Sequence, residues 1–287
     1  MGGGSPQGLV LKKLLLLALA ASAIGSASAR DREFTAIDNR ISLGYELTGW
    51  YYTEPSDTCA LGVCGNVPAS PVFDRESGFL NGLRASLAGL AFDGRLYGRL
   101  VFARAWGDVR YQGYSRSGAP IPEGLSGARV SAYSLRLGPA VSAGRVLAVP
   151  FLQYGHEGWR RIVGVATPQR YEEDYGHDYL GFGTLFQLVL TPRWVLSAYA
   201  LAGETLNAGI RVPSLGFAQA LGTGPLLKGG ALLDWRLSRA VGLYAGVRYT
   251  RFSYGQSPPQ VSGNLVIMEP ASQTIVVRYE GGLRIFF

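Results

Sequence analysis

A strict alternation of apolar residues with polar or small ones runs along most of this chain and constrains its fold more than any other feature. Successive side chains of a β-strand point to opposite faces, so a period of two predicts strands that present one apolar face. The clearest example is residues 277–287, which end the sequence on Phe287. Comparable stretches recur at 41–48, 83–90, 133–138, 180–189, 227–237 and 241–249. The sequence therefore predicts an all-β fold with many strands.

The composition excludes several other classes. Hydrophobic residues make up 47% of the chain, and 16 Tyr, 12 Phe and 5 Trp are too many for a disordered segment. Charged residues make up only 16%, against roughly 25% in an average soluble domain. Beyond the N-terminus no run approaches about 18 apolar residues, the length that a transmembrane helix needs. A strand-rich membrane protein is consistent with these values.

The connections between the predicted strands alternate in length. Strand structure in a bilayer must close on itself to satisfy its backbone polar groups, and outer-membrane barrels combine short periplasmic turns with long outer loops. We therefore predict a closed antiparallel up-and-down transmembrane β-barrel of about ten strands, within a range of eight to twelve. Arg99 and Arg104 would lie on opposite faces of one predicted strand. This placement requires a bulge, or a strand that extends beyond the membrane. Short connections are expected at 93–94, 142–145, 192–193 and 238–240, and long ones at 55–77, 107–127, 164–177, 206–225 and 254–273.

The N-terminus has the three parts of a secretory signal. Lys12 and Lys13 precede the apolar run 14–21, and a small-residue stretch ends in Ala27-Ser28-Ala29. We predict a signal peptide at 1–29 with cleavage after Ala29, and a barrel domain at 30–287. The alternative is a retained N-terminal anchor.

Two cysteines and one acidic segment are the candidates for binding sites. Cys59 and Cys64 lie close together in a turn-rich stretch, and export to an oxidising compartment favours a disulfide between them. A two-thiolate metal site would lack a third ligand. Segment 172–178 is the densest acidic patch, which we interpret as a solvated loop, with a weak divalent-cation site as the alternative. We expect no metal site and no cofactor.

Together these features resemble the outer-membrane β-barrel proteins of Gram-negative bacteria. The resemblance covers essentially the whole chain after residue 29, and it implies location in the bacterial outer membrane. It also implies contact with outer-membrane lipid and lipopolysaccharide. The alternate residues of the last strand resemble the signal read by the barrel-assembly machinery, and they are Tyr279, Gly281, Leu283, Ile285 and Phe287. Aromatic residues near strand ends are expected to form interfacial girdles, namely Trp50, Tyr51, Tyr52, Trp106, Trp159, Trp194 and Tyr249.

The charged residues that alternate with the lipid-facing apolar residues are expected to face a narrow lumen. Buried charges must be paired or hydrated, so the main interpretation is a salt-bridge network that plugs the barrel. The alternative is a narrow, porin-like pore with a mild preference for anions. The excess of Arg could also contact anionic lipid headgroups. The predicted lumen residues are Glu46, Arg84, Arg136, Glu204, Lys228, Asp234, Arg236, Arg248, Arg278, Glu280 and Arg284.

No complete set of catalytic residues is recognisable along the sequence. Ten strands, and the segment 41–44, resemble the omptin proteases, whose chemistry needs an Asp pair facing an Asp-His pair. Neither His156 nor His177 lies in an Asp-x-His arrangement. Outer-membrane lipases use His-x-Ser pairs, but residues 158 and 179 are Gly158 and Tyr179. We therefore name no catalytic residue.

The expected role is that of a non-enzymatic structural or surface-interaction protein that acts through long extracellular loops on an extracellular ligand or host surface. A narrow passive channel for small solutes and an omptin-like rim hydrolase with atypical residues are the alternatives. Nucleic acid is not expected as a partner, because the basic residues are scattered and form no stripe.

Overall fold

The computed structural model describes residues 34, 37–55, 72–114, 120–163, 171–262 and 265–287. The predicted signal peptide with its cleavage site after Ala29 lies outside the described residues, and so do Cys59 and Cys64 with their predicted disulfide. No helix among the described residues is long and apolar enough to cross a bilayer.

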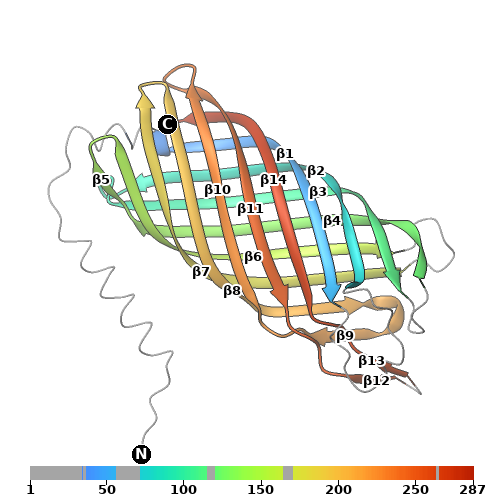
Figure 1. Ribbon diagram of the computed structural model, residues 1–287. Helices are drawn as coiled ribbons and strands as arrows, with labels where there is room; N and C mark the ends of the chain where they lie inside the picture. Colours follow the sequence, from blue (N-terminus) through green and yellow to red (C-terminus); the bar gives the residue numbers. More distant parts are fainter. Residues whose placement is uncertain (1–33, 35–36, 56–71, 115–119, 164–170, 263–264) are drawn as a thin grey trace, which may run out of the picture.

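Ten long antiparallel strands form a closed barrel, as the sequence predicts (Figure 1). Strand β1 pairs with both β2 and β14, and β10 pairs with both β8 and β11, so the ring closes without a free edge. This closure satisfies the backbone requirement of a bilayer. The strands are β1 (Arg40–Pro55), β2 (Val72–Ala91), β3 (Leu96–Tyr114), β4 (Pro120–Pro139), β6 (Val146–Val163), β7 (Tyr171–Thr191), β8 (Trp194–Val212), β10 (Pro225–Arg236), β11 (Val241–Tyr254) and β14 (Ser272–Phe286).

The expected short connections lie together at one end of the barrel, and the other connections lie at the opposite end. Tight turns join the strands at one end, where the short β5 (Val141–Ala143) pairs with β6 and where Phe287 also lies (Figure 1). At the other end are the 3-10 turn η1 (Pro213–Leu215), β9 (Phe217–Ala220), and the β12 (Gln260–Ser262) and β13 (Leu265–Ile267) hairpin. We call the first end the turn end and the second the loop end.

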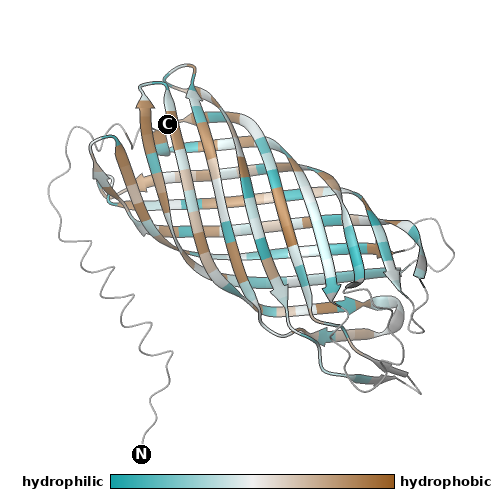
Figure 2. Ribbon diagram, viewed as in Figure 1, coloured by the Kyte–Doolittle hydropathy of each residue, from teal (hydrophilic) through white to brown (hydrophobic). Residues whose placement is uncertain are grey.

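An apolar belt surrounds the turn-end half of the barrel. Leu83 is 59% exposed, Leu283 53% and Phe182 47%, and their neighbours in the sequence are buried or half-buried. Figure 2 shows apolar and polar residues alternating along these strands. Apolar side chains so exposed around a whole barrel need an apolar solvent, which is the hydrocarbon of a bilayer.

The strands are longer than the membrane requires. Strand β7 has 21 residues, so at ~3.3 Å per residue and a tilt of ~45° it rises about 50 Å, twice the ~25 Å of a lipid-facing band. Outward-facing residues change from apolar to polar at one level around five strands, and this level marks the outer edge of the belt. The residues at this edge are Arg104, Ser131, His156, Asp178 and Glu204. The loop-end half of the barrel therefore stands above the hydrocarbon.

This extension corrects the predicted loops. Segments 107–127 and 164–177 were expected to be loops, but β3 continues to Tyr114 and β7 already begins at Tyr171. Above the hydrocarbon both faces of a strand can be polar, so alternation of hydropathy disappears although the strand continues. The extension also accounts for Arg99 and Arg104, of which the first is buried inside and the second exposed outside without a bulge between them.

Three of the expected girdle residues lie inside the barrel. Trp50, Tyr52 and Trp159 are 1%, 0% and 4% exposed, so their assignment to the lipid interface was wrong. A position near a strand end does not determine which face of the sheet a side chain points to. These three side chains are at the inward-facing positions of their strands. Tyr51, Trp106 and Tyr249 are exposed on the outer surface, and Trp194 is half-buried and stacked on Trp235.

Candidate functional site

The lumen holds ten of the eleven charges that the sequence assigns to it. The exception is Glu204, which is exposed on the outer face of β8, so its lumen assignment was wrong. On this strand Tyr199 and Leu201 point inward while small Ala residues point outward, so side-chain size gives no signal of the lipid face. The inward charges are Glu46, Arg84, Arg136, Lys228, Asp234, Arg236, Arg248, Arg278, Glu280 and Arg284.

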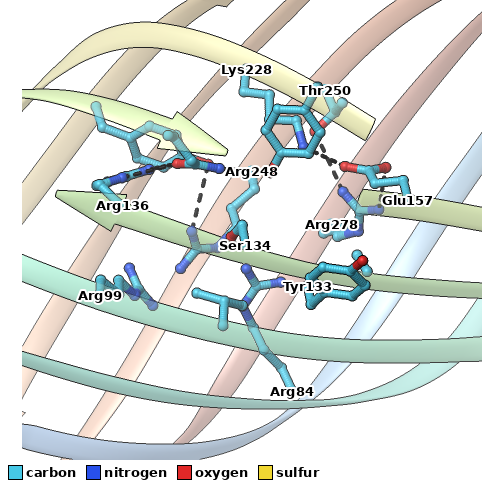
Figure 3. Close-up of a pocket in the computed structure, with 15 residues that line it drawn as sticks. Arg84, Arg99, Tyr133, Ser134, Arg136, Glu157, Lys228, Arg248, Thr250 and Arg278 are labelled. Carbon is cyan, nitrogen blue, oxygen red and sulfur yellow. Dashed lines mark hydrogen bonds and ion pairs between the residues drawn. The ribbon is translucent and has the colours of Figure 1, made fainter. Parts of the chain in front are cut away.

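Basic side chains surround a small cavity at the level of the membrane (Figure 3). Arg84 contacts Glu46 at 3.2 Å and Glu280 at 3.3 Å, and Arg248 contacts Glu280 at 2.7 Å. Lys228 pairs with Glu157. The cavity measures about 40 Å³, room for only a few waters, since one water needs ~10–15 Å³ on this measure.

Two arginines at this cavity use partners other than carboxylates. Arg136 donates to Gln153 Oε1 at 2.8 Å and lies over the rings of Phe151 and Tyr199. Arg99 donates to Ser86 Oγ at 3.3 Å. The guanidinium groups are thus held by amide, hydroxyl and ring contacts.

An aromatic layer crosses the lumen above the cavity. Along β1, Trp50 and Tyr52 follow Glu46, and along β6, Trp159 follows Glu157, so the layer lies on the loop side of the basic cavity. The Trp159 ring lies 5.0 Å from Trp50 and 4.9 Å from Tyr52. Tyr175 stacks on Trp159 at 4.9 Å. We call Trp50, Tyr52, Trp159 and Tyr175 the aromatic septum.

An acidic cluster lies above the septum, outside the membrane-spanning part. Arg161 contacts three carboxylates, at 3.0 Å for Asp74, 2.7 Å for Glu76 and 2.9 Å for Glu173. Tyr175 Oη donates to Glu269 Oε1 at 2.7 Å. Burial raises the pKa of Glu269 to about 8, and the Glu173 carboxylate adds to this rise.

The turn end is also filled. Asp38 contacts Arg40 at 2.9 Å and accepts a hydrogen bond from Gln187 at 2.9 Å, and Arg284 pairs with Asp234. Phe34 and Ile37 are each 2% exposed, so both are packed inside the barrel. From the turn end to the acidic cluster, the described side chains fill the lumen with paired charges and packed rings, as in barrels of this size.

A second concave site lies on the outer wall, at the outer edge of the apolar belt. In the sheet register, Ser131 on β4 lies opposite Arg104 on β3 and Gly158 on β6, and Gly158 lies opposite Gly176 on β7. Gly158 lacks a side chain and lines the floor of a hollow of about 340 Å³. We call this hollow the outer trough. Its lining residues are Arg104, Arg129, Val130, Ser131, Gly158, Trp159, Arg160, Asp174 and Tyr175.

Three arginines surround the outer trough. Arg160 contacts Asp174 at 2.7 Å and Glu172 at 3.9 Å. Arg104 and Arg129 are exposed, and neither makes an ion pair with any residue that the structure describes. The outer trough is therefore a basic hollow at the height where a bilayer presents its headgroups.

A histidine–aspartate pair lies below the trough on the same wall. His156 Nδ1 lies 3.0 Å from Asp178 Oδ1, and Asn207 donates to Asp178 Oδ2 at 3.0 Å. The imidazole stacks on Tyr133 with ring centroids 5.2 Å apart. A Cβ at Gly158 would lie 3.6 Å from His156 Nε2 and 3.3 Å from Ser131 Oγ, so both atoms face the same open point.

No local pattern in the sequence signals this arrangement. A His-x-Ser pair on one strand would need a serine at position 158, where Gly158 lies. The structure instead brings Ser131 opposite Gly158 from the neighbouring strand, and Asp178 opposite His156 from the other side.

His177, the other histidine, is buried in the lumen beside Tyr254, at 2.7 Å from its hydroxyl. Segment 172–178, expected to be a loop, belongs to β7, and Glu173 points inward while Asp174 and Asp178 face outward. The described residues contain no group of three His, Cys, Asp or Glu that could hold a metal ion.

No protein-family model matches this chain, and no curated protein matches it either. Among solved structures, the outer membrane protease OmpT from Escherichia coli superposes with a TM-score of 0.52 at 8% identity, over 86% of this chain and 95% of that one. The chain folds as an outer-membrane β-barrel of omptin size. The translocator domain of the autotransporter NalP from Neisseria meningitidis gives a TM-score of 0.42 at 11% identity, over 98% of this chain and 96% of that one. At such identities the likeness concerns the fold alone.

Proposed function

We propose that this outer-membrane barrel is a surface-interaction protein whose ligand is an anionic lipid of the outer leaflet, bound in the outer trough. The observation that carries the proposal is the trough itself, where Arg104 and Arg129 lie beside a hollow of about 340 Å³ just above the apolar belt. Guanidinium groups bind phosphate with paired hydrogen bonds. The phosphorylated end of lipopolysaccharide has this chemistry, and its acyl chains would lie along the apolar wall below.

The lumen supports this role rather than transport. The aromatic septum and the small basic cavity leave little room for a solute, and the charges there are held by contacts with other side chains. A narrow passive channel is therefore the weaker candidate. Interaction through the long loops stays a prediction, because parts of these loops lie outside the described residues.

The binding proposal is tested by removing the arginines that make no ion pair among the described residues. The double variant Arg104→Gln, Arg129→Gln should bind purified lipopolysaccharide at least about tenfold more weakly in detergent titrations, because two charge-assisted contacts are lost. The control is Arg75→Gln, Arg251→Gln, which changes two exposed arginines that do not line the trough. Equal binding by both double variants and the wild type would overturn the proposal.

A further inference from the structure

We propose that Ser131, His156 and Asp178 form a hydrolytic triad on the outer wall, which cleaves a carboxylic ester of a lipid bound in the outer trough. The choice of substrate rests on the proposed lipid binding, whereas the triad itself rests on the geometry of these three side chains.

The pair of His156 and Asp178 has the orientation that a catalytic base requires. Asp178 engages Nδ1 at 3.0 Å, and Asn207 holds the other carboxylate oxygen at 3.0 Å. Stacking on Tyr133 fixes the plane of the imidazole. With Nδ1 protonated toward Asp178, Nε2 carries the lone pair and faces the trough, as in a Ser-His-Asp arrangement.

Ser131 supplies the nucleophile from the neighbouring strand. It is exposed, and its hydroxyl has no hydrogen-bond partner among the described residues. The absent side chain of Gly158 leaves open the point that lies within 4 Å of both Ser131 Oγ and His156 Nε2. Catalytic hydrogen bonds are commonly longer before substrate binds, and the proposed triad requires Ser131 Oγ and His156 Nε2 to approach each other across this open point.

Arg104 is the group placed to stabilise the developing oxyanion. Backbone N–H groups around Ser131 are engaged in the sheet, where β4 pairs with β3 on one side and β6 on the other. A side chain must therefore stabilise the negative charge of the oxyanion. Arg104 lies directly opposite Ser131 in the sheet register. A guanidinium that is free of carboxylates among the described residues can donate to an anionic oxygen.

The reaction then proceeds in two balanced steps. Ser131 Oγ attacks the ester carbonyl while His156 Nε2 takes the hydroxyl proton, and collapse of the tetrahedral intermediate breaks the carbon–oxygen bond of the ester. His156 returns the proton to the departing alcohol, which leaves an acyl group on Ser131. Water, deprotonated by His156, attacks this acyl group, and His156 returns the proton to Ser131 Oγ as the bond to the serine breaks and the carboxylic acid leaves. The products are one alcohol and one fatty acid for each water consumed.

The test uses the full chain in detergent and two probes. The first is lipopolysaccharide, with released fatty acid measured by mass spectrometry, and the second is p-nitrophenyl butyrate, a short uncharged ester. Ser131→Ala and His156→Gln should each lower both rates about a thousandfold. The control Ser253→Ala, at a half-buried serine of β11 away from the trough, should leave both rates unchanged. A heat-dependent gel shift verifies that each variant is folded.

A fluorophosphonate probe gives an independent readout, because it should modify Ser131 and should fail to do so in the folded His156→Gln variant. Arg129→Gln separates this inference from lipid binding, since it removes one arginine of the proposed lipid site and should slow the lipopolysaccharide reaction more than butyrate hydrolysis. Butyrate hydrolysis that depends on Ser131, without any effect of Arg129→Gln on lipid, would retain the triad and remove the proposed ligand. Absence of Ser131-dependent hydrolysis and of labelling, with lipid binding intact, would overturn the triad.

Discussion

The lumen and the outer trough treat charged side chains in opposite ways. Inside the barrel, Arg161 alone contacts three carboxylates, and Arg84 bridges Glu46 and Glu280. On the outer wall, Arg104 and Arg129 have no ion-pair partner among the described residues. Both regions are rich in arginine, so composition alone does not distinguish them. The difference is whether the protein itself satisfies the charge.

This difference separates stability from function. A charge buried in the lumen must find its partner within the protein, and removing one partner leaves the other uncompensated. A charge at the headgroup level can find its partner in the lipid. We therefore expect substitutions in the lumen to affect folding, and those in the outer trough to affect binding with little effect on folding.

The largest contrast is expected between two neighbouring residues of β6. Arg161→Met leaves three buried carboxylates without their guanidinium and should destabilise the barrel by about 3–5 kcal/mol. Arg160→Met removes an exposed ion pair and should cost less than about 1 kcal/mol. Urea unfolding in lipid vesicles, followed by tryptophan fluorescence, measures both. Similar losses for the two variants would contradict the contrast between lumen and wall.

A second contrast concerns two tryptophans. Trp159→Ala opens a cavity in the aromatic septum and should cost about 3 kcal/mol. Trp106→Ala removes a ring that is 45% exposed on the outer face, and it should cost clearly less. The same unfolding assay applies to both. An equal cost would mean that the septum does not pack as tightly as its ring contacts indicate.

A third variant fills the outer trough without changing any charge. Gly158→Leu places a side chain between Ser131 and His156, and it should weaken lipopolysaccharide binding about tenfold, because the hollow that holds the ligand is occupied. Gly229→Leu, at an open position of the lipid-facing wall of β10, is the control. Detergent titration compares them, and unchanged binding by Gly158→Leu would show that the ligand lies elsewhere.

A dependence of stability on pH is expected from the acidic cluster. The pKa of Glu269 is raised to about 8 by burial, above its value in the unfolded chain. The folded state therefore holds a proton that the unfolded state loses, so stability is full below about pH 4.5 and falls as pH rises to about 8. Asp74, whose pKa burial raises to about 6, acts in the same direction over a narrower range. Glu269→Gln should flatten the decline in unfolding midpoint between pH 5 and 8. A slope identical to that of the wild type would exclude Glu269 as its source.

The sequence allows the barrel to be predicted well, and the site poorly. Alternation in β14 shows which residues face lipid, since Leu283 and Ile285 are exposed while Arg284 is buried. Above the belt this alternation ends. For this reason the sequence predicts a loop at 164–177, where β7 already begins at Tyr171. The position of Ser131 relative to His156 depends on which residues of β4 pair with which residues of β6, and no local pattern in the sequence encodes this register. Trp50 and Trp159 were misplaced for a related reason, because aromatic residues suit both a lipid interface and a packed lumen.

The central claim is that this barrel works on its outer wall and not through its lumen. It is tested most directly by photocrosslinking to lipopolysaccharide in reconstituted membranes, with a leucine-sized diazirine amino acid at position 131 or at position 132. Ser131 faces the outer trough, and its neighbour Ala132 lines the basic cavity inside. The account predicts crosslinks from position 131 that lessen when Arg104 and Arg129 are replaced, and none from position 132. Crosslinks from position 132, or none from position 131, would contradict it.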